Sequence, residues 1–449
     1  MRVGSCVGAG GASAFRRFGG DMQFGGDMQS DKRVARGLAA VRALAWLAVM
    51  HLLPAAWPLP AVAASQFTLL HSFAPGEGRA PSGGVTLDQN GALYGVTDAG
   101  GASDVGTVFR LGQSGGKLKT LHSFTTADGA LPQGTLIMDQ DGALYGTTAL
   151  GGTANRGTVF KLLPPAPGKN RWTHKLLHTF TDEGRNPHAG VVMDQNGALY
   201  GTTEFGGALG AGTVFQLNPP APGRRQWKLK VLHSFSFLGS DGQQPGGSLI
   251  LDQDGVLYGT TELGGASNRG TVFQLTQPAP GKRRWQHKVL HSFALVEGVL
   301  IEGASPRGGV VMGENGTLYG TTSGGGANDK GTVFQVSPPL PGMRRWKHKM
   351  LHSFSDFDGA LPFAGLVMDA AGVLFGTTSA GGTGAGTVFR IIPPARGKRA
   401  ARHKVLHSFA PPDGSTPLAG LGIGQDGALY GTTQHGGSSS MGTVFKVLP

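Results

Sequence analysis

Histidine recurs at one fixed place in this sequence, and its imidazole can serve as a metal ligand or as an acid–base group. Seven copies of Leu-His-Ser-Phe, one of them reading Leu-His-Thr-Phe, follow one another at intervals of 51 to 61 residues. Their histidines are His71, His122, His178, His233, His291, His352 and His407. Zinc requires three or four ligands around one point, whereas each copy contributes one such histidine and should hold it far from the next. We therefore expect these histidines to pack or hydrogen-bond between repeats and to bind no metal.

Acidic residues form a second recurring pattern, Asp-x-Asn/Asp-Gly, at Asp88, Asp139, Asp194 and Asp252. This pattern resembles pieces of calcium-binding loops. A full loop needs more oxygen ligands and a distal glutamate, and no glutamate stands at that spacing. Two further copies, Gly313-Glu314-Asn315 and Asp369-Ala370-Ala371, lose the pattern but keep the glycine, which favours a hairpin turn over a Ca²⁺ site.

A third pattern, Thr-Thr-x-x-Gly-Gly, is constant in its frame and variable at its two central positions. The first variable position holds Asp98, Ala149, Glu204, Glu262, Ser323, Ser379 and Gln434. A constant frame reflects the fold, while free positions can carry specific contacts. We predict a ligand-binding surface made of Asp98, Glu204, Glu262, Gln434, His435 and Arg307.

Basic residues gather in proline- and glycine-containing turns that recur in five of the repeats, and a tryptophan follows four of these turns. The predicted basic face consists of Arg224, Arg225, Arg283, Arg284, Arg344 and Arg345. Two interpretations are open. The turns are solvated hairpin tips with tryptophan covering the sheet edge, or they bind a polyanion such as an acidic glycan. Sequence-specific recognition of nucleic acid is not expected.

No catalytic signature accompanies these patterns. His-Glu-x-x-His and the phosphate-binding loop are both absent from the sequence, so we predict neither catalytic residues nor a cofactor. Scattered residues can still assemble in a funnel, which keeps an enzyme acting on polysaccharide, with Glu204 and Glu262 as its acids, as the alternative.

The elements that would position these residues are short strands. In the fourth copy, Ser248–Asp252, Val256–Thr261, Thr271–Leu275 and Trp285–Phe293 are apolar or alternating runs separated by turn signals. Four antiparallel strands repeated seven times predict an all-β, seven-bladed β-propeller. A β-solenoid is the competing repeat fold, and two hairpin turns per repeat argue against it.

The ends of the repeat array predict how the ring closes. The strand Phe67–Phe73 precedes any full repeat, and the last element is the third strand Thr443–Val447. If the Leu-His-Ser-Phe strand is outermost in each blade, the N-terminal strand must complete the seventh. Pairing the two ends would leave no open sheet edge.

The long motif running from Leu-His-Ser-Phe through Gly-x-Leu-Tyr-Gly-Thr-Thr to Gly-Thr-Val-Phe resembles the GloVer tandem repeat of bacterial secreted and surface proteins, the "choice-of-anchor" repeat group. The resemblance covers residues 66–449. The Asp-Gln-Asp-Gly-x-Leu-Tyr-Gly-Thr-Thr core is also similar to the repeat core of two-component-regulator propellers. The resemblance implies a propeller and supplies no enzymatic activity or functional residue for this chain.

Residues 1–64 differ from the rest in kind. Lys32, Arg33, Arg36 and Arg42 precede an apolar run, prolines and a small-residue segment ending at Ala64, which is the order of a secretory signal peptide. The only cysteine, Cys6, lies in this segment. We predict an N-terminal extension with signal peptide over 1–64, a propeller over 65–449, and a secreted or periplasmic product without a membrane span.

The sequence thus favours a secreted, non-catalytic propeller that acts as a binding or scaffold module for a carbohydrate or another cell-envelope component. The formal charge of +12 is compatible with a glycan or another polyanion as partner. We expect a monomer.

Overall fold

The computed structural model describes residues 66–295, 301–394 and 400–449. The chain divides into two units, Met1–Ala63 and Ala64–Pro449, and the account below concerns the second. The predicted leader lies outside the described residues, as do Lys398 and Arg399 of the last basic turn. The described part of the chain contains no helix that could cross a bilayer.

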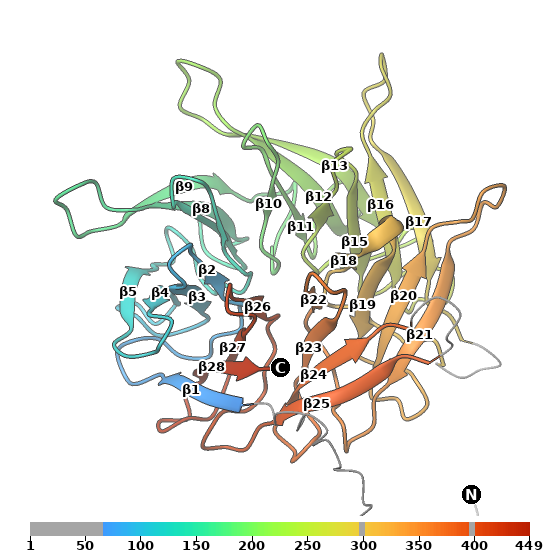
Figure 1. Cartoon of the computed structure of the whole chain (residues 1–449). Helices are drawn as coiled ribbons and strands as arrows, with labels where there is room; N and C mark the ends of the chain where they lie inside the picture. The colour runs from blue at the N-terminus through green and yellow to red at the C-terminus, as the bar shows by residue number, and fades with distance from the viewer. Residues whose placement is uncertain (1–65, 296–300, 395–399) are drawn as a thin grey trace, which may run out of the picture. The chain divides into compact units, whose positions relative to one another are not determined.

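Seven four-stranded antiparallel sheets make up the second unit, and Figure 1 shows them arranged around a centre. Blade 1 contains β2 (Thr86–Leu87), β3 (Leu93–Thr97), β4 (Thr107–Leu111) and β5 (Lys119–Ser123). Blade 2 contains β6 (Ile137–Met138), β7 (Leu144–Thr148), β8 (Thr158–Leu163) and β9 (Thr173–Thr179). Blade 3 contains β10 (Val192–Met193), β11 (Leu199–Thr203), β12 (Gly210–Asn218) and β13 (Lys228–Ser236). The predicted seven-bladed propeller is confirmed.

The remaining blades repeat this order. Blade 4 contains β14 (Ile250–Leu251), β15 (Leu257–Thr261), β16 (Thr271–Thr276) and β17 (Gln286–Ser292). Blade 5 contains β18 (Val311–Met312), β19 (Leu318–Thr322), β20 (Thr332–Ser337) and β21 (Lys347–Ser353), with the short 3-10 helix η1 (Glu314–Gly316) between its first two strands. Blade 6 contains β22 (Val367–Met368), β23 (Leu374–Thr378), β24 (Thr387–Ile392) and β25 (Arg402–Ser408). Blade 7 contains β26 (Gly422–Ile423), β27 (Leu429–Thr433), β28 (Thr443–Leu448) and β1 (Gln66–Ser72).

Ring closure occurs as predicted, because β1 from the start of the described chain is the fourth strand of blade 7. It pairs antiparallel with β28, with Phe67 opposite Val447 and Ser72 opposite Thr443. The first strand of each blade is shorter than expected. In blade 4 the structure pairs only Ile250 and Leu251 with β15, because the residues before them line the central channel without a strand partner.

The hydrophobic core consists of seven layers, each lying between two neighbouring blades. Between blades 1 and 2, for example, Tyr94 and Phe124 pack with Leu144 and Phe160. The phenylalanine of each Gly-Thr-Val-Phe segment is fully buried, as Phe215 illustrates with no exposed surface. Blade-to-blade packing therefore stabilises the ring and fixes where each blade presents its loops.

The Asp-x-x-Gly segments are hairpin turns, as predicted. Asp88 Oδ1 accepts hydrogen bonds from the backbone N–H of Asn90 and Ala92, both at 2.9 Å. Its other oxygen accepts the hydroxyl of Tyr94 at 3.1 Å. The carboxylate is thus used within its own turn and secures the buried tyrosine of the next strand.

Candidate functional site

The candidate site is a cavity at the mouth of the central channel, and its backbone is the same in all seven blades. In each blade the residue before a proline adopts left-handed φ, as Leu131 (φ 54°) and Thr416 (φ 57°) show. Such values are costly for leucine and for β-branched threonine. They persist because each residue is held on both sides: Leu131 N–H donates to Val105 O, and Ala149 N–H donates to Leu131 O, both at 3.0 Å.

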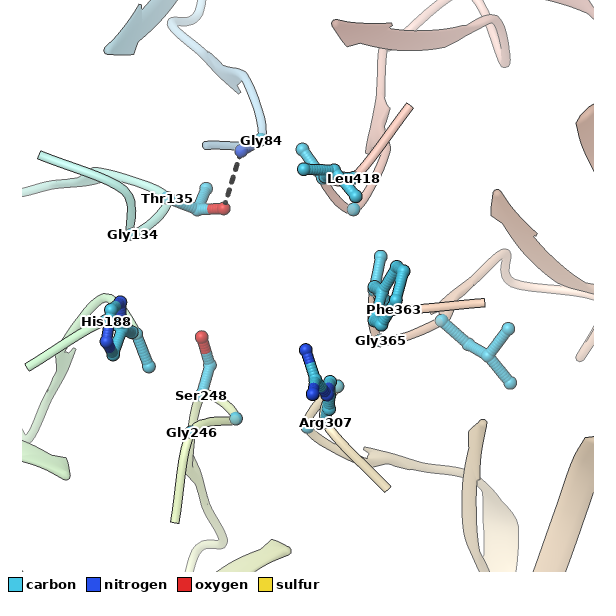
Figure 2. Close-up of a pocket in the computed structure, with 18 of the residues that line it drawn as sticks. Gly84, Gly134, Thr135, His188, Gly246, Ser248, Arg307, Phe363, Gly365 and Leu418 are labelled. Atoms are coloured by element: carbon cyan, nitrogen blue, oxygen red, sulfur yellow. Dashed lines mark hydrogen bonds between the residues drawn. The ribbon is translucent and has the colours of Figure 1, made fainter. Parts of the chain in front are cut away.

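The residue after that proline projects toward the channel, and it differs in every blade. From blade 1 to blade 7 these residues are Ser82, Gln133, His188, Gly246, Arg307, Phe363 and Leu418. Figure 2 shows five of these positions around the opening. We call these seven residues the mouth ring.

A threonine latch between blades fixes the mouth ring in place. The hydroxyl of Thr147 in blade 2 donates to the carbonyl of Ala189, the residue that follows His188, at 2.7 Å. Equivalent bonds follow around the ring, ending with Thr432 to Gly83 O at 3.1 Å. Blade 1 has Val96 in place of this threonine. There Thr135 substitutes, since its hydroxyl accepts the N–H of Gly84 at 3.1 Å (Figure 2).

Glycines recur in the lining of the throat beneath the ring, where segments that precede the first strands of neighbouring blades approach each other closely. A Cβ on Gly134 would lie 2.3 Å from Gly190 N, and one on Gly190 would lie 2.2 Å from Thr135 O. A side chain could therefore not be accommodated at these two positions. The hydroxyls of Thr135 and Ser248 are the polar groups that side chains place there (Figure 2).

The mouth ring and part of the Thr-Thr-x set enclose a cavity of about 620 Å³. The structure brings five of the six residues predicted for the binding surface to this cavity: Asp98, Glu204, Glu262, Gln434 and Arg307. His435 is not among its lining residues and instead bridges Ser415 through the backbone. Of the seven mouth-ring residues, only Arg307 was predicted from the sequence. The other six stand in a frame, Pro-x-Gly/Ala, whose outer residues are constant and whose central residue varies, as in Thr-Thr-x.

One arc of the cavity is a continuous polar network across blades 1 to 3. The hydroxyl of Ser82 donates to Asp98, and Gln133 Nε2 donates to the other oxygen of Asp98 at 3.1 Å. The side-chain oxygen of Gln133 then faces His188 Nδ1. His188 Nε2 lies 2.7 Å from Glu204 Oε2. With this amide orientation, both ring nitrogens of His188 face an oxygen atom, one from Gln133 and one from Glu204.

The three acidic side chains of the cavity differ in their surroundings. Asp98 is only 8% exposed, and desolvation raises the pKa of its carboxyl, against the opposing effects of the hydrogen bonds from Ser82 and Gln133 and of the nearby His188. Glu204 is paired with His188. Glu262 accepts both Nε and Nη2 of Arg307, at 2.9 and 2.6 Å.

The opposite arc is apolar. Phe363 and Leu418 form it, and the guanidinium carbon of Arg307 lies 5.0 Å from the centre of the Phe363 ring. The cavity therefore has one wall of charged and amide groups and one of an aromatic ring and an aliphatic side chain. Seven equivalent backbone positions produce an asymmetric site.

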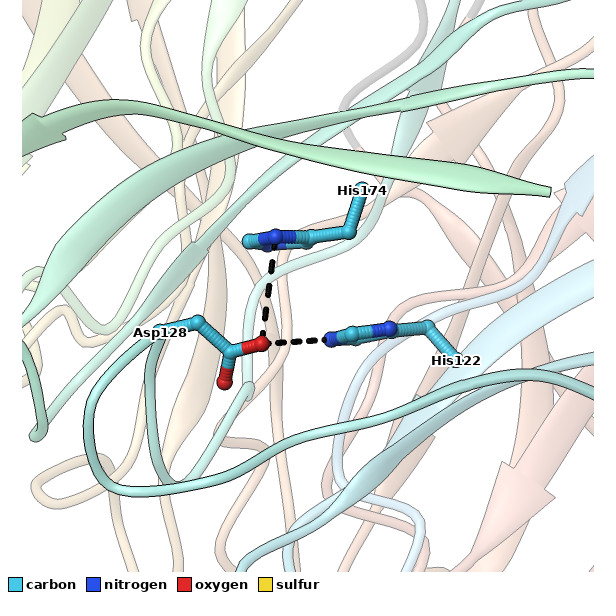
Figure 3. Close-up of side chains that lie close together, drawn as sticks. All are labelled: His122, Asp128 and His174. Atoms are coloured by element: carbon cyan, nitrogen blue, oxygen red, sulfur yellow. Dashed lines mark hydrogen bonds and ion pairs between the residues drawn. The ribbon is translucent and has the colours of Figure 1, made fainter.

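The Leu-His-Ser-Phe histidines lie outside this cavity, between the outer strands of neighbouring blades. The prediction that they are far from other histidines was wrong. We expected neighbouring histidines to be far apart, with one per repeat. In fact His174, on β9 of blade 2, stacks on His122 of blade 1 with ring centres 4.4 Å apart (Figure 3). The second histidine stands four residues before the Leu-His-Ser-Phe histidine and occurs in only four repeats, so it did not appear as part of the repeated pattern.

Each such pair shares a carboxylate. His122 Nε2 lies 3.0 Å from Asp128 Oδ2, and His174 Nδ1 lies 3.8 Å from the same oxygen (Figure 3). Four groups of this kind occur among the described residues: His122, Asp128 and His174; His233, Asp241 and His287; His291, Glu302 and His348; His352, Asp358 and His403.

The geometry of these groups favours packing over metal binding. The two rings in Figure 3 are parallel to within 7°, so their in-plane lone pairs cannot both point at one ion. Leu118, Leu229 and Phe67 occupy the position of the second histidine in the other three blades, and Phe67 stacks on His407 at 3.9 Å in the same manner. That these histidines hold no metal stays a prediction.

The predicted basic face lies at the other end of the blades. The Thr-Thr-x loops follow the second strand, and the Pro-Gly turns follow the third, so antiparallel pairing puts them at opposite ends. The six arginines predicted there, Arg224, Arg225, Arg283, Arg284, Arg344 and Arg345, are all exposed. The adjacent tryptophans are half-buried and cover the preceding blade: Trp172 packs edge-on against Tyr94 with ring centres 6.1 Å apart.

Fold and repeat together define the class of this protein, a β-propeller built from tandem repeats. The Gloeobacter/Verrucomicrobia repeat matches residues 60–273, 167–381 and 286–449. The chain belongs to this repeat family. No curated protein matches it.

Several solved structures resemble the chain at low sequence identity. A putative glucose dehydrogenase from Thermus thermophilus is 16% identical with a TM-score of 0.43, over 86% of this chain and all of the other. The extracellular domain of a putative one-component system from B. thetaiotaomicron is 10% identical with a TM-score of 0.49, over 84% of this chain and 39% of the other. A gluconolactonase from Xanthomonas campestris is 14% identical with a TM-score of 0.38, over 69% and 85%.

Proposed function

We propose that this propeller is a non-catalytic binding module whose ligand, a carbohydrate or a similar polar component of the cell envelope, occupies the cavity at the mouth ring. The observation that supports this most is the contrast between backbone and side chains. The seven loops share one hydrogen-bonded conformation, yet every mouth-ring residue differs. A purely structural ring would not need this variety.

The chemistry of the two walls fits a sugar. Carboxylates and an amide held by neighbouring blades can accept and donate hydrogen bonds to hydroxyl groups without prior reorganisation. Phe363 and Leu418 offer an apolar surface to the C–H face of a pyranose ring. Cavities that bind small ligands combine apolar walls with a few fixed polar groups in this way.

An enzyme acting on polysaccharide is less well supported. The two glutamates suggested as its acids are already engaged by other side chains of the cavity: Glu204 contacts His188, and Glu262 pairs with the guanidinium of Arg307. Burial does raise the pKa of Asp98, but both its oxygens already accept hydrogen bonds from Ser82 and Gln133.

The leader-like residues 1–64 lead us to propose that the module acts outside the cytoplasm. Fractionation of cells producing the full chain would test this. Enrichment in periplasm or medium with loss of the leader by mass spectrometry is expected, and an intact cytoplasmic product would contradict it.

Binding is tested on an oligosaccharide panel with the wild-type chain, measuring retention and the release of reducing ends. We expect retention without release. Glu204→Gln and His188→Ala should each weaken binding by roughly 10- to 100-fold, the usual effect of losing a hydrogen bond to a charged group.

Ser379→Ala is the matched control, because Ser379 stands at the same position of its repeat as Glu204 but does not line the cavity. Affinity should be unchanged in this variant. Release of reducing ends by the wild type that is abolished in Glu204→Gln would overturn the non-catalytic proposal. An equal loss of oligosaccharide affinity in Ser379→Ala and Glu204→Gln would show that the ligand does not bind in the cavity.

A further inference from the structure

The outer hairpins of the propeller segregate charge by sign. Six segments connect the third to the fourth strand and include the fourth strand itself: 112–123, 164–179, 219–236, 277–292, 338–353 and 393–408. They contain 22 of the 39 lysines and arginines of the chain and none of its 27 aspartates and glutamates. Because these segments are about a fifth of the chain, an even distribution of acids would have put several there.

These positive charges are free for an external partner. Arg224, Arg225, Arg283 and Arg284 are exposed at the tips of two neighbouring hairpins, and along the outer strands Lys175, Lys230 and Lys288 also face solvent. Among the described residues none of these seven side chains forms an ion pair. On the channel-mouth side, by contrast, Arg79 pairs with Asp104 and Arg156 with Asp182.

Protection of the sheet edge explains only part of this pattern. Lysine on an exposed edge strand discourages pairing with another chain. That purpose needs charge along the strand, and acids would serve it as well. It does not require two adjacent arginines at the tip of a hairpin that extends outward from the ring, as the β12–β13 and β16–β17 loops do in Figure 1.

We propose that the basic outer hairpins bind an acidic polysaccharide that follows the rim of the propeller. The tips repeat around the ring at one end of the blades, so a flexible chain carrying regularly spaced carboxylate or sulfate groups can contact several of them at once. Such contact gains affinity from many weak charge pairs and from released counterions.

Two other polyanionic partners fit the surface less well. Single-stranded nucleic acid is usually held by bases stacked on exposed aromatic side chains, and here Trp172 and Trp285 are committed to the tyrosines of the preceding blades. A bilayer would favour apolar residues at the tips. Among the hairpin tips that the structure describes, only the β20–β21 tip, with Leu340 and Met343, carries large exposed apolar side chains.

The proposal is tested with the full chain, using heparin as the acidic polysaccharide and measuring Kd over a range of NaCl concentrations. Each charge contact contributes a little under one unit to the slope of log Kd against log salt. Changing Arg224, Arg225, Arg283 and Arg284 together to serine should therefore reduce this slope by about 3 and leave the melting temperature unchanged.

The matched control changes four arginines on the channel-mouth side, Arg79, Arg156, Arg185 and Arg269, to serine. A salt slope that falls equally in both variants would show a general effect of net charge and would overturn the proposal. A slope of log Kd against log salt near zero for the wild-type chain would also overturn the proposal. This measurement does not depend on the folding of any variant. The Arg→Lys version of the four hairpin substitutions should keep the slope, since it keeps the charges.

Two parallel measurements decide the partner class. Single-stranded DNA of matched charge and vesicles containing one third anionic lipid are titrated under the same conditions. Weaker binding to both than to heparin is expected, and tighter binding to either would overturn the assignment to polysaccharide. The cavity variant Glu204→Gln should bind heparin like the wild type, so this surface and the proposed cavity site can fail independently.

Discussion

The stacked histidines between blades should make the propeller sensitive to acid in a defined pH range. Burial and the neighbouring His122 lower the pKa of His174 from 6.5 to about 4, although Asp128 acts in the opposite direction. An unfolded chain would bind a proton at this residue near pH 6.5, whereas the folded chain resists protonation until about pH 4. Stability from this source is therefore complete above pH 6.5 and is lost as the pH falls toward 4.

The magnitude follows from the shift. One pKa unit corresponds to about 1.4 kcal/mol, so lowering the pH from 6.5 to 5 should remove about 2 kcal/mol of unfolding free energy at His174. The pKa values of His287 and His403 are likewise lowered to about 4, and that of His348 to about 3, mainly by burial. Four interfaces together would lose about 8 kcal/mol, a large part of the 5–15 kcal/mol typical of a domain.

The chain itself supplies the variants. Leu229 stands opposite Leu217 in blade 3 as His287 stands opposite Leu275 in blade 4. His174→Leu should therefore preserve the packing and reduce the acid-induced loss by about 2 kcal/mol. Leu229→His should increase it by a similar amount, because Glu183 and His178 already occupy that interface.

Urea unfolding followed by tryptophan fluorescence at pH 7.5 and pH 5.0 measures both changes. Acid-induced losses that are identical in wild type, His174→Leu and Leu229→His would refute the assignment of acid sensitivity to these stacks. A larger loss in His174→Leu than in wild type would show instead that the protonated pair stabilises the folded ring.

Three further results are expected. Phe215→Ala should lower the unfolding free energy by roughly 3–5 kcal/mol, because Phe215 is fully buried between blades; a loss below about 1 kcal/mol in urea unfolding would contradict this. Removing β1 (Gln66–Ser72) should leave β28 unpaired and cause concentration-dependent association, measured by light scattering. Thr147→Val should cost about 1 kcal/mol by removing the latch to Ala189 O, whereas Val96→Thr in blade 1 should cost nothing comparable.

Most of the fold could be predicted from the sequence because the same pattern of strands and turns recurs seven times. Strand order, hairpin turns and ring closure all follow from patterns within one repeat and from the incomplete copies at the two ends. Contacts between blades could not be predicted in the same way. The stack of His122 on His174 joins residues of different repeats, and nothing in the sequence aligns an outer strand with the one before it.

The candidate site was predicted in part for a related reason. Asp98, Glu204 and Glu262 stood out because they are charged residues in a frame that is otherwise constant. In the mouth ring only Arg307 stood out by charge, while Phe363 and Leu418 looked like ordinary apolar residues. Their common role depends on the left-handed residue before the proline, which places all seven mouth-ring residues at the channel.

The two ends of the blades vary in opposite ways, and this difference bears on their functions. At the hairpin tips the residues change from copy to copy, but the sign of the charge does not. This is what contact with a uniform, repeating partner requires, because each blade then meets the same chemistry. At the mouth ring the backbone is constant, while size, polarity and charge all change. A symmetric polymer cannot exploit such a ring, but a single asymmetric ligand at the channel mouth meets each side chain once. The two surfaces therefore differ in the kind of chemistry that each presents: one sign of charge repeated along the hairpin tips, and an asymmetric set of side chains at the channel mouth.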